Sequence, residues 1–394
     1  MTDETSMPLE GVVVLDLSRA LAGPHAAMML ADMGARVIKV EMPGRGDDTR
    51  SWGPPFVGPN KDISTYYLSC NRNKESLELD LGNAEDKQLL LRLVRHADVL
   101  IKNFRPGWLD GAGLSTDTLH EANPRLIVLS LTGFGHDGPE GLRRGYDQIG
   151  QGEAGIMSIT GPDADAPTKV GTPIGDLSAG MYGAFGVVTA LYERERTGRG
   201  RVVRASLLSA LVGIHAFQGA DWLVGGVVRR GAGNHHPSIA PYGLFQAADG
   251  PVQIACGSQD QWRRLCGLLG IDPDADGMAT NLERVQNRDL VIDTVSAACS
   301  RIPALDLLVQ LEDAGIAAGK VRTIDEVYSW EQTRSQGLVI EVAHPELGAI
   351  ELAGPPVRFD NNAHAGGRMT HTAPPALGQH NDTIRAWLDE MEGQ

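Results

Sequence analysis

The stretch VVVLDLSRALAGPHAAMMLADMGARVIKVE, residues 12–41, decides the fold. It begins with a β-branched run at 12–17, continues through a helical pattern around 24–33, and ends in a second apolar run at 36–41. Apolar runs separated by an amphipathic segment are typical of a β-α-β unit, which joins two parallel strands. We therefore expect a parallel sheet whose strands are buried on both faces.

The same rhythm continues along the chain. A helical pattern near 84–96 leads into DVLIKN at 98–103, and RLIVLSLTGFG follows at 125–135. Residues 176–197 are predicted to form one long helix rich in small residues, which glycines end before the strand-like RVVRAS. The predicted fold class is α/β, with a Rossmann-like large domain built on the parallel sheet.

The sequence changes in character beyond about residue 225. The run GLFQAADGPVQIACG contains Asp249-Gly250 between two strand-like segments, which indicates a hairpin. A helical pattern follows at 289–313, and further strand signals lie at 338–352. We therefore predict a smaller α+β domain inserted into the large one. The predicted divisions are 1–224 for the first part of the large domain, 225–325 for the small domain, and 326–394 for the part that returns to the large domain.

Composition narrows the classes of function. The 394 residues include 50 acidic and 35 basic side chains, and the net charge of −15 opposes binding to nucleic acid or to an anionic membrane. The N-terminus lacks a basic region followed by an apolar one, and no apolar run approaches the roughly 20 residues that span a bilayer, so we expect a cytoplasmic protein. The four cysteines are scattered without CxxC spacing, so neither a disulfide framework nor a metal site is predicted.

Asp176 lies in GTPIGDLSAG, residues 171–180, where a glycine-rich loop runs into the long helix. An aspartate at such a junction most often caps the helix, and the motif alone favours that role. Bare backbone at Gly171 and Gly175 would also let a bulky substrate approach and would offer N–H groups to an oxyanion. A carboxylate nucleophile needs little beyond such exposure and positioning.

Blocks spread over nearly the whole chain resemble the family III CoA-transferases, also called the CaiB/BaiF type and typified by formyl-CoA transferase and carnitine CoA-transferase. Each block is modest, but their order and spacing are jointly specific. The blocks are LEGVVVLDLSRALAGP (9–24), GARVIKVEMPGRGDDTR (34–50), NRNKESLELDL (71–81), ADVLIKNFRPG (97–107), GTPIGDLSAG (171–180), TGRGRVV (197–203), GNHHPSIAPY (233–242) and LGQHND (377–382).

The resemblance implies that Asp176 is the nucleophile. Its carboxylate would attack an acyl-CoA to give a mixed anhydride, which the expelled CoA would convert to an aspartyl-CoA thioester. An acceptor carboxylate would then reverse these steps, so the partners are an acyl-CoA, with succinyl-CoA a reasonable donor, and a small carboxylic acid. No permanently bound cofactor is implied, because the CoA thioester is itself the substrate. The resemblance also implies an intertwined homodimer.

Coenzyme A carries several negative charges, so basic residues within the matching blocks are candidates to bind it. Singly, each would more often be a solvated surface cation. The CoA-site candidates are Arg19, Ala22, Arg72, Lys74, Asn103, Phe104, Arg105, Arg144, Tyr146 and Gly175, and the candidates for the acceptor acid are His235, His236 and Tyr242.

The chain also departs from formyl-CoA transferase. Arg19, Leu21, Met42 and Gly111 each stand where that enzyme carries a different residue, which argues against formyl-CoA as the substrate. The glycine run that can cover the site of that enzyme corresponds to GSQDQ at 257–261 in this chain. If a lid exists, its chemistry differs.

Two alternatives stay open. An α-methylacyl-CoA racemase of the same superfamily would use a His and an Asp as acid and base, but this chain has Tyr146 where the His is expected, although His136 lies nearby. A non-catalytic CoA-binding subunit would lack the aspartate, whereas Asp176 is present. A dinucleotide site is disfavoured, because ALAGP follows the first strand in place of GxGxxG.

Overall fold

The structure is a computed structural model that describes residues 7–359 and 366–393. The chain divides into two compact units. The first unit comprises the described residues of 1–156, 169–227 and 330–394, and the second comprises 157–168 and 228–329.

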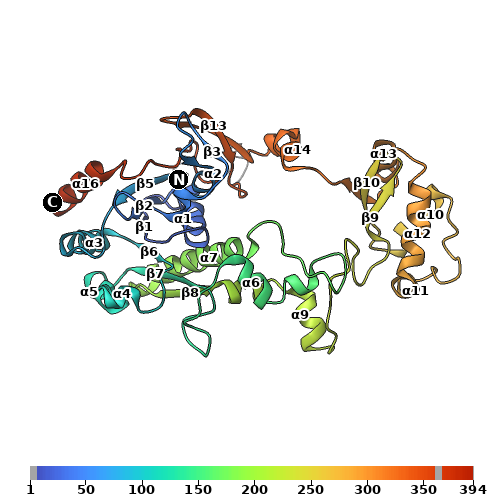
Figure 1. The fold of residues 1–394 in the computed structure, drawn as a ribbon, viewed down its shortest axis with the longest axis horizontal. Helices are drawn as coiled ribbons and strands as arrows, with labels where there is room; N and C mark the ends of the chain where they lie inside the picture. The colour runs from blue at the N-terminus through green and yellow to red at the C-terminus, as the bar shows by residue number, and fades with distance from the viewer. Residues whose placement is uncertain (1–6, 360–365, 394) are drawn as a thin grey trace. The chain divides into compact units, whose positions relative to one another are not determined.

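A six-stranded parallel sheet forms the centre of the first unit (Figure 1). Its strand order is β5-β2-β1-β6-β7-β8, so β1 lies between β2 and β6. In this arrangement Val14 is in register with Val37 on one side and Val99 on the other. The strands span β1 Val13–Asp16, β2 Arg36–Glu41, β5 Lys74–Glu78, β6 Val99–Lys102, β7 Ile127–Thr132 and β8 Val202–Ser206.

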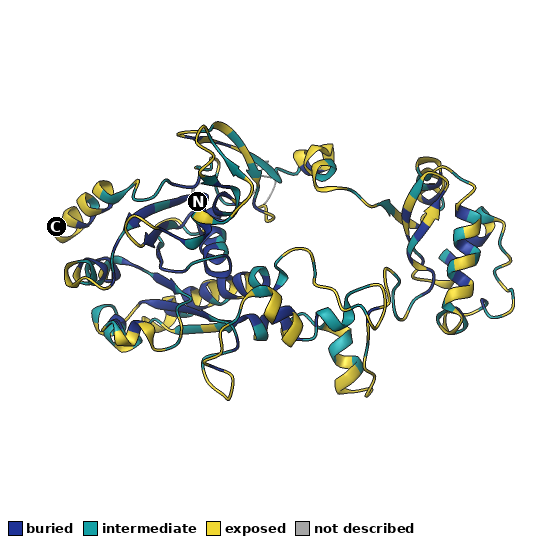
Figure 2. Ribbon diagram, in the orientation of Figure 1, coloured by how far each residue is buried: buried dark blue, intermediate teal, exposed yellow. Residues whose placement is uncertain are grey.

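Helices cover both faces of this sheet, and the strands between them are buried (Figure 2). Val14 contributes to the core shared with α1, α7 and α8, whereas its neighbour Leu15 contributes to the core shared with α3, α5 and α16. This alternation explains why the strands consist of continuous apolar runs. The helices span α1 Ala22–Asp32, α3 Ala84–His96, α5 Thr116–Ala122, α7 Ile174–Thr197, α8 Leu207–Gly213 and α16 Asn381–Gly393.

Helix α7 is the longest helix, and its small residues let it pack closely against α1. A Cβ atom at Gly180 would lie only 2.7 Å from the Ala22 carbonyl oxygen. By length and composition alone, α7 is the one helix of the described residues that could cross a membrane. Its small and apolar residues, including Ala179 and Val187, are nevertheless buried in the core beside the sheet, as in a core helix of a globular protein.

Shorter elements complete the first unit. Two of its hairpins are antiparallel, β3 with β4 and β12 with β13. The elements are β3 Phe56–Val57, β4 Ile63–Ser64, α2 Thr65–Ser69, α4 Trp108–Gly111, α6 Asp147–Glu153, α9 Ala216–Leu223, α15 Glu331–Ser335, β12 Val339–His344 and β13 Gly348–Ala353, with a 3-10 turn at Asp48–Ser51. The 3-10 turn at Met157–Ile159 belongs to the second unit.

The second unit is an α+β structure with its own core. A three-stranded antiparallel sheet in the order β11-β10-β9 packs with helices around Phe245, Trp262 and Val295. Its elements are β9 Tyr242–Ala247, β10 Gly250–Ala255, α10 Gln259–Leu269, α11 Asn281–Gln286, α12 Arg288–Cys299, α13 Ala304–Asp313, β11 Ala317–Lys320 and α14 Ile324–Ser329.

The predicted α/β class and parallel sheet are confirmed. The pattern at 289–313 is two helices, because Pro303 lies at the N-cap of α13 and separates it from α12. The hairpin is confirmed too, but its turn is shifted by one residue, since β10 already begins at Gly250. The four cysteines are buried free thiols.

Candidate functional site

The site lies where the order of the strands reverses. Strands β1 and β6 are neighbours, but the strand that follows β1 lies toward one edge of the sheet and the strand that follows β6 lies toward the other. Ligands of open α/β sheets bind at such a point, outside the carboxyl ends of the two strands. The segments that follow the two strands are joined by a pair of hydrogen bonds. The Arg19 N–H donates to Asn103 Oδ1 at 2.9 Å, and Asn103 Nδ2 donates to the Arg19 carbonyl at 2.7 Å.

Buried charges beneath these segments fix the loop after β1. Lys39 Nζ donates to the Ser18 carbonyl at 3.0 Å and to Asp47 Oδ2 at 2.8 Å, while Asp47 Oδ1 accepts from the Ala20 N–H at 3.2 Å. Ala20 itself has the left-handed φ of 64°, which turns the chain toward α1. Burial would lower the pKa of Lys39, but the nearby carboxylates of Asp47 and Asp16 outweigh it and raise that pKa.

Asp176 lies in the first turn of α7, at the third helical position. The residue before the helix, Pro173, makes no side-chain cap. The cap comes instead from Asp147 at the start of α6. Asp147 Oδ1 accepts from the Gly175 N–H at 2.7 Å and from the Asp176 N–H at 3.3 Å. The Asp176 side chain is therefore not used as a helix cap.

The surroundings of Asp176 disfavour its ionised form. Burial raises the pKa of this carboxyl from 3.8 to about 7, and the adjacent charge of Asp147 contributes to the same rise. No cation is among the causes that shift this pKa. Asp176 therefore titrates near neutral pH, as suits a carboxylate that must react rather than stay paired.

Asp176 faces a pocket of about 760 Å³, which is large enough for a cofactor-sized ligand. Apolar and aromatic groups line part of the wall, including Trp52, Tyr66 and Leu131. Although the protein is acidic overall, five cations also line this pocket. They are Arg19, Arg105, Arg143, Arg144 and Lys169.

These five cations are not equivalent. Arg143 forms ion pairs with Glu140 and Glu153, and its guanidinium lies over the Phe134 ring. Among the described residues, by contrast, the side chains of Arg105 and Arg144 form no hydrogen bond or ion pair. Both remain able to bind an anionic ligand.

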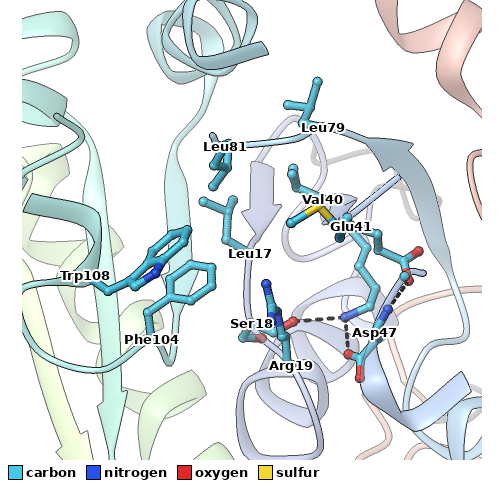
Figure 3. A pocket seen from close by; sticks show the side chains of 13 residues that line it. Leu17, Ser18, Arg19, Val40, Glu41, Asp47, Leu79, Leu81, Phe104 and Trp108 are labelled. Carbon is cyan, nitrogen blue, oxygen red and sulfur yellow. Dashed lines mark hydrogen bonds and ion pairs between the residues drawn. The ribbon is translucent and has the colours of Figure 1, made fainter. Parts of the chain in front are cut away.

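A narrower recess adjoins this pocket and shares Arg19 and Phe104 with it. Figure 3 shows Phe104 and Trp108 on one side of the recess and Glu41 and Asp47 on the other. The Phe104 and Trp108 rings are stacked with centroids 4.5 Å apart, and the Arg19 guanidinium lies 5.4 Å from the Phe104 centroid. The recess thus offers flat aromatic surface beside a positive charge.

Comparison with known proteins identifies the family. The family model described as CoA-transferase family III matches residues 9–381. The chain belongs to this family. Human succinyl-CoA:glutarate CoA-transferase is 38% identical over 379 residues, covering 96% of this chain and 85% of the human protein. The succinate–glutarate CoA-transferase of Agrobacterium fabrum is 39% identical over 392 residues, covering 98% of this chain and 96% of that protein.

A solved structure agrees with this assignment. The crystal structure of a CaiB/BaiF family protein from Brucella suis superimposes with a TM-score of 0.87 at 38% identity, covering 97% of this chain and 100% of that one. The protein is therefore a CoA-transferase, and CoA thioesters are its substrates.

Most of the residues predicted to bind CoA do line the main pocket of this CoA-transferase. Arg19, Ala22 and Asn103 come from the loops after β1 and β6, and Phe104 and Arg105 follow directly. The segment before α6 contributes Arg144 and Tyr146, and α7 contributes Asp176. Gly175 does not line the pocket, and its N–H is bonded to Asp147. It is therefore not free to serve an oxyanion as predicted.

Arg72 and Lys74 were predicted to bind CoA, but the structure gives them a different role. Arg72 is buried and donates to Asp32 at 2.9 and 2.6 Å. Lys74 is buried as well, and its Nζ donates to Asp16 at 2.9 Å and to Asn71 Oδ1 at 2.9 Å. Neither lines the pocket. Basic residues inside a family block can equally be ion-paired core residues, and sequence alone does not distinguish the two.

His235, His236 and Tyr242, the candidates for the acceptor acid, belong to the second unit. The rings of His236 and Tyr242 are stacked with centroids 5.1 Å apart, and the His236 N–H donates to the Tyr242 carbonyl at 2.8 Å. Arg288 donates to the His236 and Pro237 carbonyls. These contacts make the Gly-rich loop an ordered part of the second unit.

Two further sequence expectations bear on the site. The segment expected to correspond to a glycine lid forms the start of α10, where Ser258 caps the helix and the Gly257 N–H donates to Gln261 at 2.8 Å. His136 does not line the pocket, and its Nε2 is 2.9 Å from Ser130 Oγ. No histidine is among the residues that line the main pocket within the described chain.

Sequence reasoning missed several pocket residues. Asp147, Trp52, Tyr66 and Lys169 line the pocket, but none of them was singled out from the sequence. The sequence gives only a weak indication of the role of Asp147, because the fold alone shows that its side chain reaches the N-terminus of α7. Among the described residues no group of three or more His, Cys, Asp or Glu side chains is placed to hold a metal ion.

Proposed function

We propose that this CoA-transferase moves CoA from succinyl-CoA to a small dicarboxylic acid through covalent intermediates on Asp176. The observation that carries the proposal is the position of Asp176, which faces a pocket lined by five cations and has no cationic partner of its own among the described residues. A carboxylate in that setting is reactive, and the cations suit the phosphates of CoA.

The reaction divides into four displacements. The Asp176 carboxylate attacks the carbonyl carbon of succinyl-CoA and expels the CoA thiolate, which leaves a mixed anhydride. The thiolate then attacks the Asp176 carbonyl carbon and expels succinate, which leaves an aspartyl-CoA thioester. The acceptor carboxylate attacks this thioester and releases the thiolate again. The thiolate finally attacks the acceptor carbonyl and frees the Asp176 carboxylate, so no proton is gained or lost overall.

The names of related proteins support succinyl-CoA as the CoA donor. Proteins 35% identical to this chain are named succinyl-CoA–D-citramalate CoA-transferase, from Chloroflexus aurantiacus, and succinyl-CoA:mesaconate CoA-transferase, from Haloarcula hispanica. With the human and Agrobacterium proteins, these names share succinyl-CoA or succinate, and each acceptor is a dicarboxylic acid. We infer that glutarate or a similar diacid is the acceptor.

CoA is proposed to bind in both the main pocket and the adjoining recess. Arg19, Arg105 and Arg144 would meet the phosphates, because they line the main pocket and Arg105 and Arg144 carry no recorded ion pair in the described ranges. The stacked rings of Phe104 and Trp108 would contact the adenine. The thioester would then extend along the main pocket toward Asp176.

A homodimer is also proposed. One side of α7 exposes Tyr182, Phe185 and Tyr192, of which Phe185 is 72% exposed, and α9 and its end expose Trp222 and Val224, the latter 90% exposed. Large exposed apolar groups on α7 and at α9 indicate a covered surface in the working protein. A second copy of this chain is the proposed occupant, as the family resemblance implies.

A panel assay tests the proposed substrates. Succinyl-CoA, acetyl-CoA and formyl-CoA are each offered with glutarate, oxalate and formate, and product CoA thioesters are separated chromatographically. We expect succinyl-CoA with glutarate to give the highest kcat/KM and Asp176→Asn to lower it by at least about 10³-fold. Exchange of an α-proton of 2-methylacyl-CoA in deuterated water without any acid would instead indicate a racemase.

A further inference from the structure

Two carboxylates share the start of α7. Asp147 of α6 accepts the Gly175 and Asp176 N–H groups on one oxygen, at 2.7 and 3.3 Å, so it occupies the positive end of the helix that carries Asp176. Its charge also contributes to the raised pKa of Asp176. The arrangement places a fixed negative charge beside the residue proposed to react.

The second oxygen of Asp147 is fixed by Gln151. Gln151 Nε2 donates to Asp147 Oδ2 at 2.7 Å, while Gln151 Oε1 accepts from the Val170 N–H at 2.8 Å. Gln151 is fully buried, with 0% exposure. Because its amide oxygen faces an N–H donor, its NH₂ group must face Asp147. Both oxygens of Asp147 therefore accept hydrogen bonds, which hold its side chain in one orientation at the start of α7.

We propose that Asp147 is a positioning residue that holds a fixed negative charge beside Asp176 and so favours the covalent intermediates of the transfer. The inference rests on the proposed function. In the mixed anhydride and in the thioester the Asp176 side chain is neutral, whereas before and after the reaction it is a carboxylate. Each acylation of Asp176 thus removes the repulsion between the two side chains, and each release restores it.

Tyr66, a titratable group whose pKa responds to Asp176, does not provide a compensating positive charge. Tyr66 of α2 lines the same pocket, and burial followed by the charge of Asp176 raises the pKa of its phenol to about 12. Burial and Asp147 account for the raised pKa of Asp176 itself. Asp147 is therefore the charged neighbour whose removal changes Asp176 most directly.

A titration followed by NMR tests the inference without using activity. Protein labelled with ¹³C at the aspartate side-chain carboxyls is titrated from pH 4 to 9, and the Asp176 signal is assigned by its loss in Asp176→Asn. In Asp147→Asn, which keeps an oxygen for the α7 N–H groups, we expect the Asp176 midpoint to fall by at least one pH unit. Asp137→Asn, an equal change at an exposed site outside the pocket, should leave it in place.

The second arm measures the intermediate. After mixing with succinyl-CoA, the fraction of protein trapped as aspartyl-CoA thioester is expected to fall several-fold in Asp147→Asn and to remain unchanged in Asp137→Asn. If Asp147→Asn prevents folding, Asp147→Ser keeps a smaller acceptor and serves in both arms. An unmoved Asp176 midpoint in a folded variant would overturn the inference. A shifted midpoint with no thioester even in the unmodified protein would instead overturn the proposed function.

Discussion

Asp16 and Asp176 show how neighbours decide what an aspartate does. Burial would raise the pKa of Asp16, but the charges of Lys74 and Lys39 outweigh burial, so its pKa is lowered and it stays a structural carboxylate. Burial raises the pKa of Asp176 to about 7, and here the nearest charge, Asp147, acts in the same direction. One residue type therefore gives a stable ion pair in one place and a reactive group in another.

The raised pKa of Asp176 predicts a pH-dependent stability. The folded protein holds this proton more tightly than the unfolded chain, so the stability of the fold falls as pH rises from about 4 to about 7. Asp176→Asn mimics the protonated form and should be more stable than the original protein above pH 7, by roughly 1–4 kcal/mol. Urea unfolding at pH 4.5 and 8 measures this. An equal difference at both pH values would contradict the assigned cause.

Arg144 gives a prediction about binding. Its exposed guanidinium lines the pocket and has no recorded partner within the described ranges, so its loss should affect the anionic ligand and not the fold. Arg144→Ala is expected to raise KM for the acyl-CoA about tenfold, and the effect should shrink in high salt. Arg199→Ala, at an exposed site just after the end of α7, is the control. Steady-state kinetics at two ionic strengths would show an unchanged KM if Arg144 does not meet CoA.

At the scale of elements, buried ion pairs join β1, β2 and β5 beneath the site. Lys74 of β5 reaches Asp16 of β1 at 2.9 Å, and both side chains are fully buried. Lys74→Ala would leave the Asp16 charge with less compensation, so we expect a loss of about 3–5 kcal/mol of stability. Thermal unfolding measures it. The prediction fails if the variant melts within a degree or two of the original protein.

The same scale shows what could be predicted from the sequence and why the rest could not. The strands 12–17 and 36–41 were predicted because their apolar runs are continuous, and the end of α7 because Gly198 follows it in the left-handed conformation. Strand β5 was missed, since KESLE holds a single apolar residue, Leu77, and lies next to polar turns. Local pattern carries no information about which strand a segment pairs with.

The residues of the site also fall into those that the sequence predicts and those that only the fold reveals. Asp176, Arg19 and Asn103 stand in blocks that match the family, and the fold brings them to one pocket together with Arg144. Asp147 could not be found in this way, because its role depends on the approach of α6 to the start of a helix nearly 30 residues later. Arg72 and Lys74 were misplaced, because burial and pairing are properties of the folded chain.

At the scale of the whole molecule, the exposed side of α7 predicts the oligomeric state. Phe185→Asp combined with Tyr192→Asp would place two charges in the proposed interface, where the original side chains are 72% and 68% exposed in the single chain. Sedimentation velocity should show a dimer for the original protein and a monomer for this variant. Leu305→Asp, which places one charge at an exposed apolar site of α13, is the control. A monomeric original protein would contradict the proposed dimer.

The family and the transferase activity are established by whole-chain similarity, whereas the covalent route through Asp176 is the central proposal. Intact-mass measurement after mixing with succinyl-CoA tests it most directly, with peptide mapping of any adduct. We predict a species heavier by one CoA less one water, located on Asp176, which hydroxylamine removes and which Asp176→Asn does not form. Full transferase activity in Asp176→Asn, or an adduct on another residue, would contradict the account.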